Sequence, residues 1–76
     1  MIYVDDAVFH KTGSTGSWAH LTADDVDELH AFAARLGLKR SWYQPGRGGH
    51  TWHYDVTAHR RELALVLGAR ALLGST

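Results

Sequence analysis

Histidine and carboxylate side chains are concentrated in one short segment of the chain. Residues 48–56 read GGHTWHYDV, so His50, His53 and Asp55 follow a glycine-rich turn. In an extended segment His53 and Asp55 would project from the same side. Imidazole and carboxylate groups together bind ions such as Zn²⁺ or Mn²⁺, and a metal with an open coordination position activates water. The alternative is that Asp55 accepts hydrogen bonds from the amides of a following helix while His53 bonds to the backbone.

A second pair of acids, Asp5 and Asp6, follows the apolar residues MIYV. While the chain stays extended, adjacent side chains point to opposite faces, so only one of the two acids can enter a given pocket. We expect Asp5 to join His53 and Asp55 as a ligand of a divalent metal ion, which is Zn²⁺, Mn²⁺ or Mg²⁺. The alternative is a strand end at which one acid caps a turn and the other is solvated.

Aromatic rings are abundant for a short chain, and some of them must belong to the core because ring burial dominates the stability of small domains. Trp18 and Trp52 are expected in loops, where a ring can stack on a base or another planar ligand. The segment PGRGG, with Arg60 and Arg61 beyond it, could cradle a phosphate, but it matches no P-loop and favours a flexible loop. Without cysteine or a GxSxG motif, the chain has no obvious nucleophile.

The elements that must position these residues follow from hydrophobic patterns and turn signals. Residues 1–4 and the aromatic segment 40–44 predict strands, and residues 23–36 and 58–67 predict helices. Residues 69–73 predict a third strand, with a short helical extension as the alternative. Thr22 and Thr57 are the expected helix N-caps, with Asp25 at the third helical position, and Gly37 is the expected left-handed residue, closed by Leu38 in a Schellman motif.

This alternation predicts an α/β fold, a small three-stranded, mostly parallel β-α-β-α-β sheet with two helices. In such sheets ligands lie outside the carboxyl ends of the strands. The polar clusters are therefore expected to converge at that edge, with His20 approaching from the loop before the first helix.

Composition limits the classes of protein to which the chain can belong. Its 76 residues predict a single domain, residues 1–76, whose small core makes a homo-oligomer an expectation. Eight Lys and Arg balance eight Asp and Glu, which disfavours coating of duplex nucleic acid. The longest apolar run, LALVLGA, is too short to span a bilayer, and the first residues do not resemble a signal peptide. We expect no membrane association and a cytoplasmic location.

Three segments, IYVDDAVF, WAHLTADDVDELHAFAARLGLKRSWYQ and HYDVTAHRRELALVLGA, together resemble a family of short bacterial and phage proteins catalogued as a domain of unknown function. YVD and HYD are the signature elements of that family. They fall on residues 3–5 and 53–55, and the further matching positions are Trp18, His20, Glu28, Leu29, His30, Trp42 and Gln44. The segment GRGGHTW looks like an insertion relative to the family spacing, which favours His53 and Asp55 over His50 and Trp52. The resemblance implies no established activity.

The leading hypothesis is a small metal-dependent hydrolase or phosphoesterase site, in which histidine and carboxylate divide proton transfer and charge stabilisation. Its expected catalytic or ligand residues are Asp5, His20, His53 and Asp55, and its expected ligand-binding residues are Trp18, Arg40, Gln44 and Tyr54. The alternatives are a non-catalytic module that binds a small, nucleotide-like ligand and a homo-oligomeric adaptor that docks a partner chain. Whether the protein is an enzyme stays open at this point.

Overall fold

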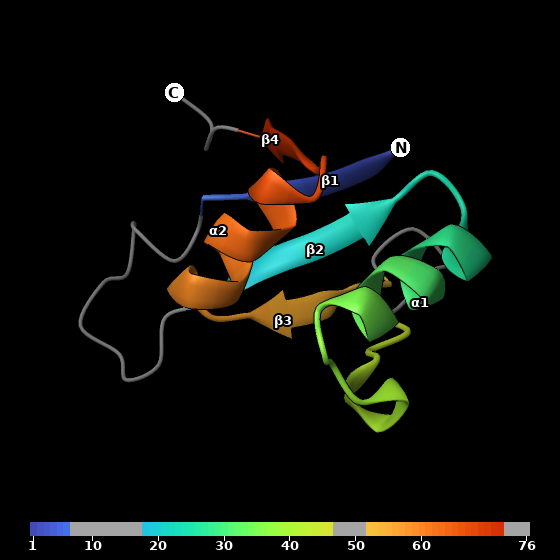
Figure 1. Ribbon diagram of the computed structural model, residues 1–76. Coiled ribbons are helices and arrows are strands. Elements are labelled where there is room, and N and C mark those ends of the chain that lie inside the picture. The colour runs from blue at the N-terminus through green and yellow to red at the C-terminus, as the bar shows by residue number, and fades with distance from the viewer. Residues whose placement is uncertain (7–17, 47–51, 73–76) are drawn as a thin grey trace.

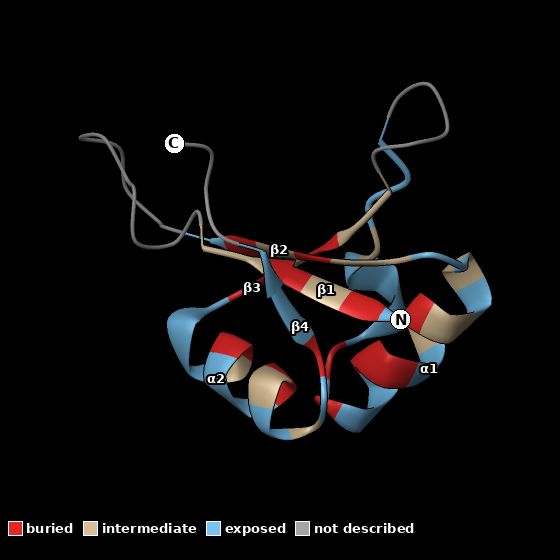
Figure 2. Cartoon of the chain, turned by 90° about the horizontal axis from the view of Figure 1, so that it is seen from above, coloured by how far each residue is buried: buried red, intermediate tan, exposed pale blue. Residues whose placement is uncertain are grey.

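The protein is built on one four-stranded sheet with both helices on the same side of it (Figures 1 and 2). The structure is a computed structural model and describes residues 1–6, 18–46 and 52–72. The elements in chain order are β1 (Ile2–Asp5), β2 (Ala19–Ala23), α1 (Val26–Arg35), the 3₁₀ helix η2 (Arg40–Trp42), β3 (Tyr54–Val56), α2 (Ala58–Val66) and β4 (Arg70–Leu72).

The sheet is mixed, and its strand order is β3-β2-β1-β4. The pairs β1–β2 and β2–β3 are antiparallel, and only β1 and β4 run parallel. The predicted α/β class with two helices is therefore confirmed, whereas the prediction of three mostly parallel strands is wrong. The error comes from residues 19–23, of which 19–22 were assigned to the approach to the first helix and Ala23 to the helix itself. In this strand Ala19 and Leu21 are buried and His20 is partly exposed, which is the alternation of a half-buried strand.

The segment 40–44 is not a strand, contrary to the prediction. Residues 40–42 form η2, which has no buried residue, and only Gln44 pairs with another segment. The backbone amides of Gln44 and His53 each donate a hydrogen bond of 2.9 Å to the carbonyl oxygen of the other residue. The strand lies instead at β3, where Tyr54 and Val56 are buried.

The core lies between the helices and one face of the sheet (Figure 2). Alternate strand residues point to this face, and full burial of a side chain such as Leu21 contributes about 1.5–3 kcal/mol. The buried strand residues are Ile2, Val4, Ala19, Leu21, Tyr54 and Val56, and helix α1 adds Leu29, Phe32 and Ala33. The intervening polar strand residues consequently lie on the opposite face, which no helix of the described residues covers.

Helix α1 begins later than predicted because residues 19–23 belong to β2. Asp25 is the N-cap in place of Thr22, and its carboxylate accepts a 3.0 Å hydrogen bond from the backbone amide of Glu28. The predicted closure is confirmed: Gly37 has a φ of 78°, and the amide of Leu38 donates to the carbonyl of Ala33 at 3.0 Å. These two features form the Schellman motif.

Helix α2 matches its prediction closely. The Thr57 hydroxyl caps it by accepting a 3.2 Å hydrogen bond from the amide of Arg60. Gly68, with a φ of 110°, ends it, and the next residues form β4 beside β1, so the predicted third strand is confirmed. In the described part of the chain, neither helix has the length and apolar character needed to cross a lipid bilayer.

Candidate metal centre

A row of polar side chains crosses three strands on the face opposite the helices. His20 on β2 stands opposite Asp55 on β3. On its other side His20 contacts Asp5 of β1, whose carboxylate oxygens approach the backbone nitrogen of His20 at 2.9 Å and its Nδ1 at 2.7 Å. His53 lies two residues before Asp55 and approaches it on the same face. Cross-strand register thus brings together residues far apart in the sequence.

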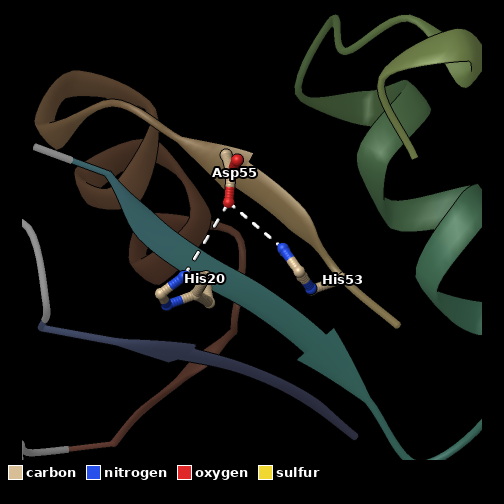
Figure 3. Close-up of side chains that lie close together, drawn as sticks. All are labelled: His20, His53 and Asp55. Carbon is tan, nitrogen blue, oxygen red and sulfur yellow. Dashed lines mark ion pairs between the residues drawn. The ribbon is translucent and has the colours of Figure 1, made fainter. Parts of the chain in front are cut away.

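Three of these side chains have ligand atoms close enough to share one metal ion. One atom each from His20, His53 and Asp55 lies within 4.8 Å of the others. Asp55 Oδ1 lies 3.3 Å from His53 Nε2 and 3.9 Å from His20 Nε2 (Figure 3). The two imidazole rings meet edge to face, with their centroids 5.1 Å apart.

One contact of the cluster has the spacing of neighbouring ligands in tetrahedral zinc coordination, and a second is longer. Zinc binds nitrogen and oxygen at about 2.0–2.2 Å, which places neighbouring ligand atoms of a tetrahedron about 3.3–3.5 Å apart. The His53–Asp55 contact of 3.3 Å already has this value. The His20–Asp55 contact of 3.9 Å is about 0.5 Å longer than this value.

Asp5 determines which nitrogen of His20 can bind a metal. A carboxylate only accepts hydrogen bonds, so the 2.7 Å contact places a proton on His20 Nδ1. In the neutral ring the lone pair is then on Nε2, the nitrogen that faces Asp55. The carbonyl oxygen of Asp5 in turn accepts a 2.7 Å hydrogen bond from Nε of the buried Arg61, which holds the end of β1 in place.

Asp55 is oriented in a comparable way by Gln44. The Gln44 side-chain amide donates a hydrogen bond to Asp55 Oδ2, which leaves Oδ1 facing the two imidazoles. Gln44 itself is held by its backbone pairing with His53. The imidazole of His20 and the carboxylate of Asp55 therefore each have a partner that orients them, which is the arrangement found around metal ligands.

The cluster is open to solvent on one side. The side chain of His20 is 44% exposed, and those of His53 and Asp55 are 21% and 31% exposed. This exposure leaves room for water or a substrate to reach an ion held by the three residues. Catalytic zinc sites commonly combine three protein ligands with a water molecule in this way.

A cavity of about 440 Å³ adjoins the cluster at Asp55 and Gln44. Aromatic rings and one arginine form much of its wall. Its lining residues are Trp18, Leu38, Ser41, Trp42, Tyr43, Gln44, Asp55, Thr57 and Arg60. Trp42 and Arg60 were not among the expected ligand-binding residues, because Trp42 was assigned to a strand and the phosphate cradle of PGRGG with Arg60 was set aside in favour of a flexible loop at PGRGG.

A family model described as a protein of unknown function, DUF4031, matches residues 2–75. The chain belongs to the DUF4031 family. No curated protein and no solved structure matches it. The expected family of unknown function is thereby confirmed, and the matched region contains the whole cluster.

In this DUF4031 chain the structure brings most of the expected site residues together, although by another route than predicted. The sequence placed them at the carboxyl ends of parallel strands, whereas β1 and β2 are antiparallel and their side chains meet across the sheet. Asp5 was expected to bind the metal directly. The structure places the Nε2 atom of His20 beside Asp55 and His53, with Asp5 behind it.

Other expected ligand-binding residues lie elsewhere. Tyr54 points into the core, where its hydroxyl is 2.8 Å from Nδ1 of His30, and burial raises the pKa of the Tyr54 phenol. The Arg40 guanidinium lies over the Tyr43 ring, 5.3 Å from its centroid, and Arg40 is not part of the cavity wall. Trp52 packs against the core. His50 lies outside the described residues.

Proposed function

We propose that this DUF4031 domain is a metal-dependent hydrolase that acts on phosphate esters. The observation that carries the proposal is the convergence of His20, His53 and Asp55 on one open sheet face, with Asp5 orienting His20 from behind. The hydrogen bond that His20 Nδ1 donates to Asp5 also leaves the metal-facing nitrogen of His20 with its lone pair.

The donor set favours Zn²⁺, with Mn²⁺ as the next candidate. Imidazole nitrogen suits zinc and other transition metals, whereas Mg²⁺ prefers oxygen ligands and keeps several waters. Two imidazoles and one carboxylate occupy three coordination positions, and water takes the fourth. Gln44 and Asp5 serve as orienting partners of the ligands and do not bind the ion themselves.

An ion held by His20, His53 and Asp55 would supply an activated water for attack on a phosphate ester. A Zn²⁺ bound there would lower the pKa of its water to about 7, and that water would release a proton to solvent at neutral pH. The oxygen of this water would bond to phosphorus, the ester P–O bond would break, and the leaving oxygen would take a proton from solvent. The products are an alcohol and a phosphate. The exposure of His20 is consistent with proton exchange directly with bulk water.

A non-catalytic binding module is the second candidate function. The observation that favours it is the cavity with aromatic walls beside Asp55, which can hold a ligand whether or not a reaction follows. Turnover separates the two candidates, since a binding module saturates with ligand and releases it unchanged. Self-association also remains a proposal, to be measured by light scattering, because a second copy is one way to cover the open sheet face.

Zinc binding by variants of the proposed ligands His53 and Asp55 tests the proposal. Metal-stripped protein is dialysed against Zn²⁺ and analysed by inductively coupled plasma mass spectrometry, and hydrolysis of p-nitrophenyl phosphate is measured on the same samples. We expect about one Zn²⁺ per chain, and at least tenfold weaker binding and no turnover in H53A and D55N. His59 is exposed on α2, so H59A is the matched control and should behave like the wild type. Full zinc binding by H53A, or no zinc binding by the wild type, would rule out the centre.

A further inference from the structure

The cavity beside Asp55 has walls that metal binding alone does not explain. Trp18, which precedes β2, and Trp42 of η2 both line it, although they come from separate segments. They are 48% and 44% exposed, which is high for the largest apolar side chain. Tyr43 adds a third ring to the same wall. Exposed aromatic rings that share one cavity are typical of sites where flat ligands stack.

The charged group of the cavity is Arg60. Among the residues that the structure describes, no carboxylate forms an ion pair with the Arg60 guanidinium. Its neighbour Arg61 differs, because it is buried and donates to the carbonyl oxygen of Asp5 and to the carboxylate of Glu62. Arg61 thus has a structural role, whereas Arg60 lines the cavity. A planar guanidinium recognises phosphate through paired hydrogen bonds.

The position of the cavity connects it with the metal centre. Asp55 belongs to both: its Oδ1 faces the imidazoles, and the residue also lines the cavity. Gln44, which orients Asp55, lines the cavity as well. A ligand that fills this space is therefore in contact with the residue that would hold the metal. The volume of about 440 Å³ lies within the range of small-molecule sites, about 300–1,000 Å³.

We propose that the cavity binds a nucleoside monophosphate, with its base against Trp18 and Trp42 and its phosphate between Arg60 and the metal centre. Cleavage of the phosphate ester bond rests on the proposed function, because it needs the metal. Binding of the nucleoside monophosphate does not need the metal. Water and the nucleoside monophosphate yield a nucleoside and inorganic phosphate. In that hydrolysis the oxygen of the activated water would bond to phosphorus, the P–O5′ bond would break, and O5′ would take a proton from solvent.

Calorimetric titration of the metal-stripped protein tests this inference, with AMP, ribose 5-phosphate and inorganic phosphate as the probes. We expect AMP to bind at least tenfold more tightly than ribose 5-phosphate, because only AMP carries a base that can stack. W42L should weaken AMP binding about tenfold and leave ribose 5-phosphate binding unchanged. R60Q should weaken both ligands, whereas R35Q, a change at an exposed arginine of α1, should weaken neither.

The outcomes distinguish this inference from the proposed function. If AMP fails to bind both metal-stripped and zinc-loaded protein, the inference is overturned, while zinc bound through His53 still supports the metal centre. If AMP binds in a Trp42-dependent way but zinc does not bind, the cavity is supported and the hydrolase is not. Equal affinity for AMP and ribose 5-phosphate also overturns the inference. Circular dichroism establishes that W42L is folded, and W18L provides an independent variant if it is not.

Discussion

Replacing Asp5 by asparagine is expected to weaken zinc binding without removing any proposed ligand. Asp5 accepts two hydrogen bonds from His20, one from the backbone amide at 2.9 Å and one from Nδ1 at 2.7 Å. Asparagine has nearly the same shape but only one acceptor oxygen, and its other terminal group is a donor. One of the two His20 donors must therefore lose its partner.

In the D5N variant, the more favourable hydrogen bonding places the proton of the His20 ring on the wrong nitrogen. If the asparagine oxygen keeps the hydrogen bond from the backbone amide of His20, the asparagine NH₂ group faces Nδ1. Nδ1 can accept a hydrogen bond from this group only when it carries no proton. The neutral ring consequently carries its proton on Nε2, the nitrogen that must bind zinc. The loss of a partner that orients a ligand typically costs 10–100-fold in metal affinity, or about 1.4–2.7 kcal/mol.

Two measurements check this prediction on the same samples. Competition with a chelating dye measures the zinc dissociation constant of D5N, and ¹⁵N chemical shifts of the metal-free protein report which nitrogen of His20 is protonated. We expect weaker zinc binding by D5N together with a change of tautomer. D27N is the matched control, because Asp27 is exposed in the first turn of α1, away from the cluster. Unchanged zinc affinity in D5N, or a lower affinity with the Nδ1 proton retained, would refute the reasoning.

Three predictions concern the scaffold and are measured by urea denaturation. Burial raises the pKa of Tyr54, so the unfolded state loses this proton at a lower pH than the folded state does. The free energy of unfolding should therefore fall as the pH rises above about 10. Y54F should show a shallower decline with pH, and an identical slope would contradict this prediction. Gly37 has a φ of 78°, so G37A should cost about 1–2 kcal/mol, and a neutral effect would argue against the left-handed closure of α1. Leu21 is fully buried, so L21A should cost about 2–5 kcal/mol, whereas V66A, at an 81% exposed position, should change little; equal effects would show that β2 is misplaced.

Local signals in the sequence were sufficient for helix α2 and for the end of helix α1. The apolar spacing and the glycine at position 37 predicted the end of α1, and Thr57 predicted the start of α2. Capping and Schellman closure involve residues only a few positions apart, so the chain carries the whole signal in one short window. The predicted start of α1 was wrong because residues 19–23 form β2. The strand partners of β2 lie far away in the sequence, so no short window carries the signal for this strand.

The sequence by itself determined which residues could form a site: the acid after the first strand, His20, and the HYD segment. Only the tertiary structure decided how they are arranged, with His20 between Asp5 and Asp55 and with the cavity wall at Trp42 and Arg60. Strand direction and register depend on hydrogen bonds between distant segments, and very short strands carry little information about their partners. A change of register by one residue would turn these polar side chains toward the core. The order of the strands therefore decides whether the same residues can share a metal ion.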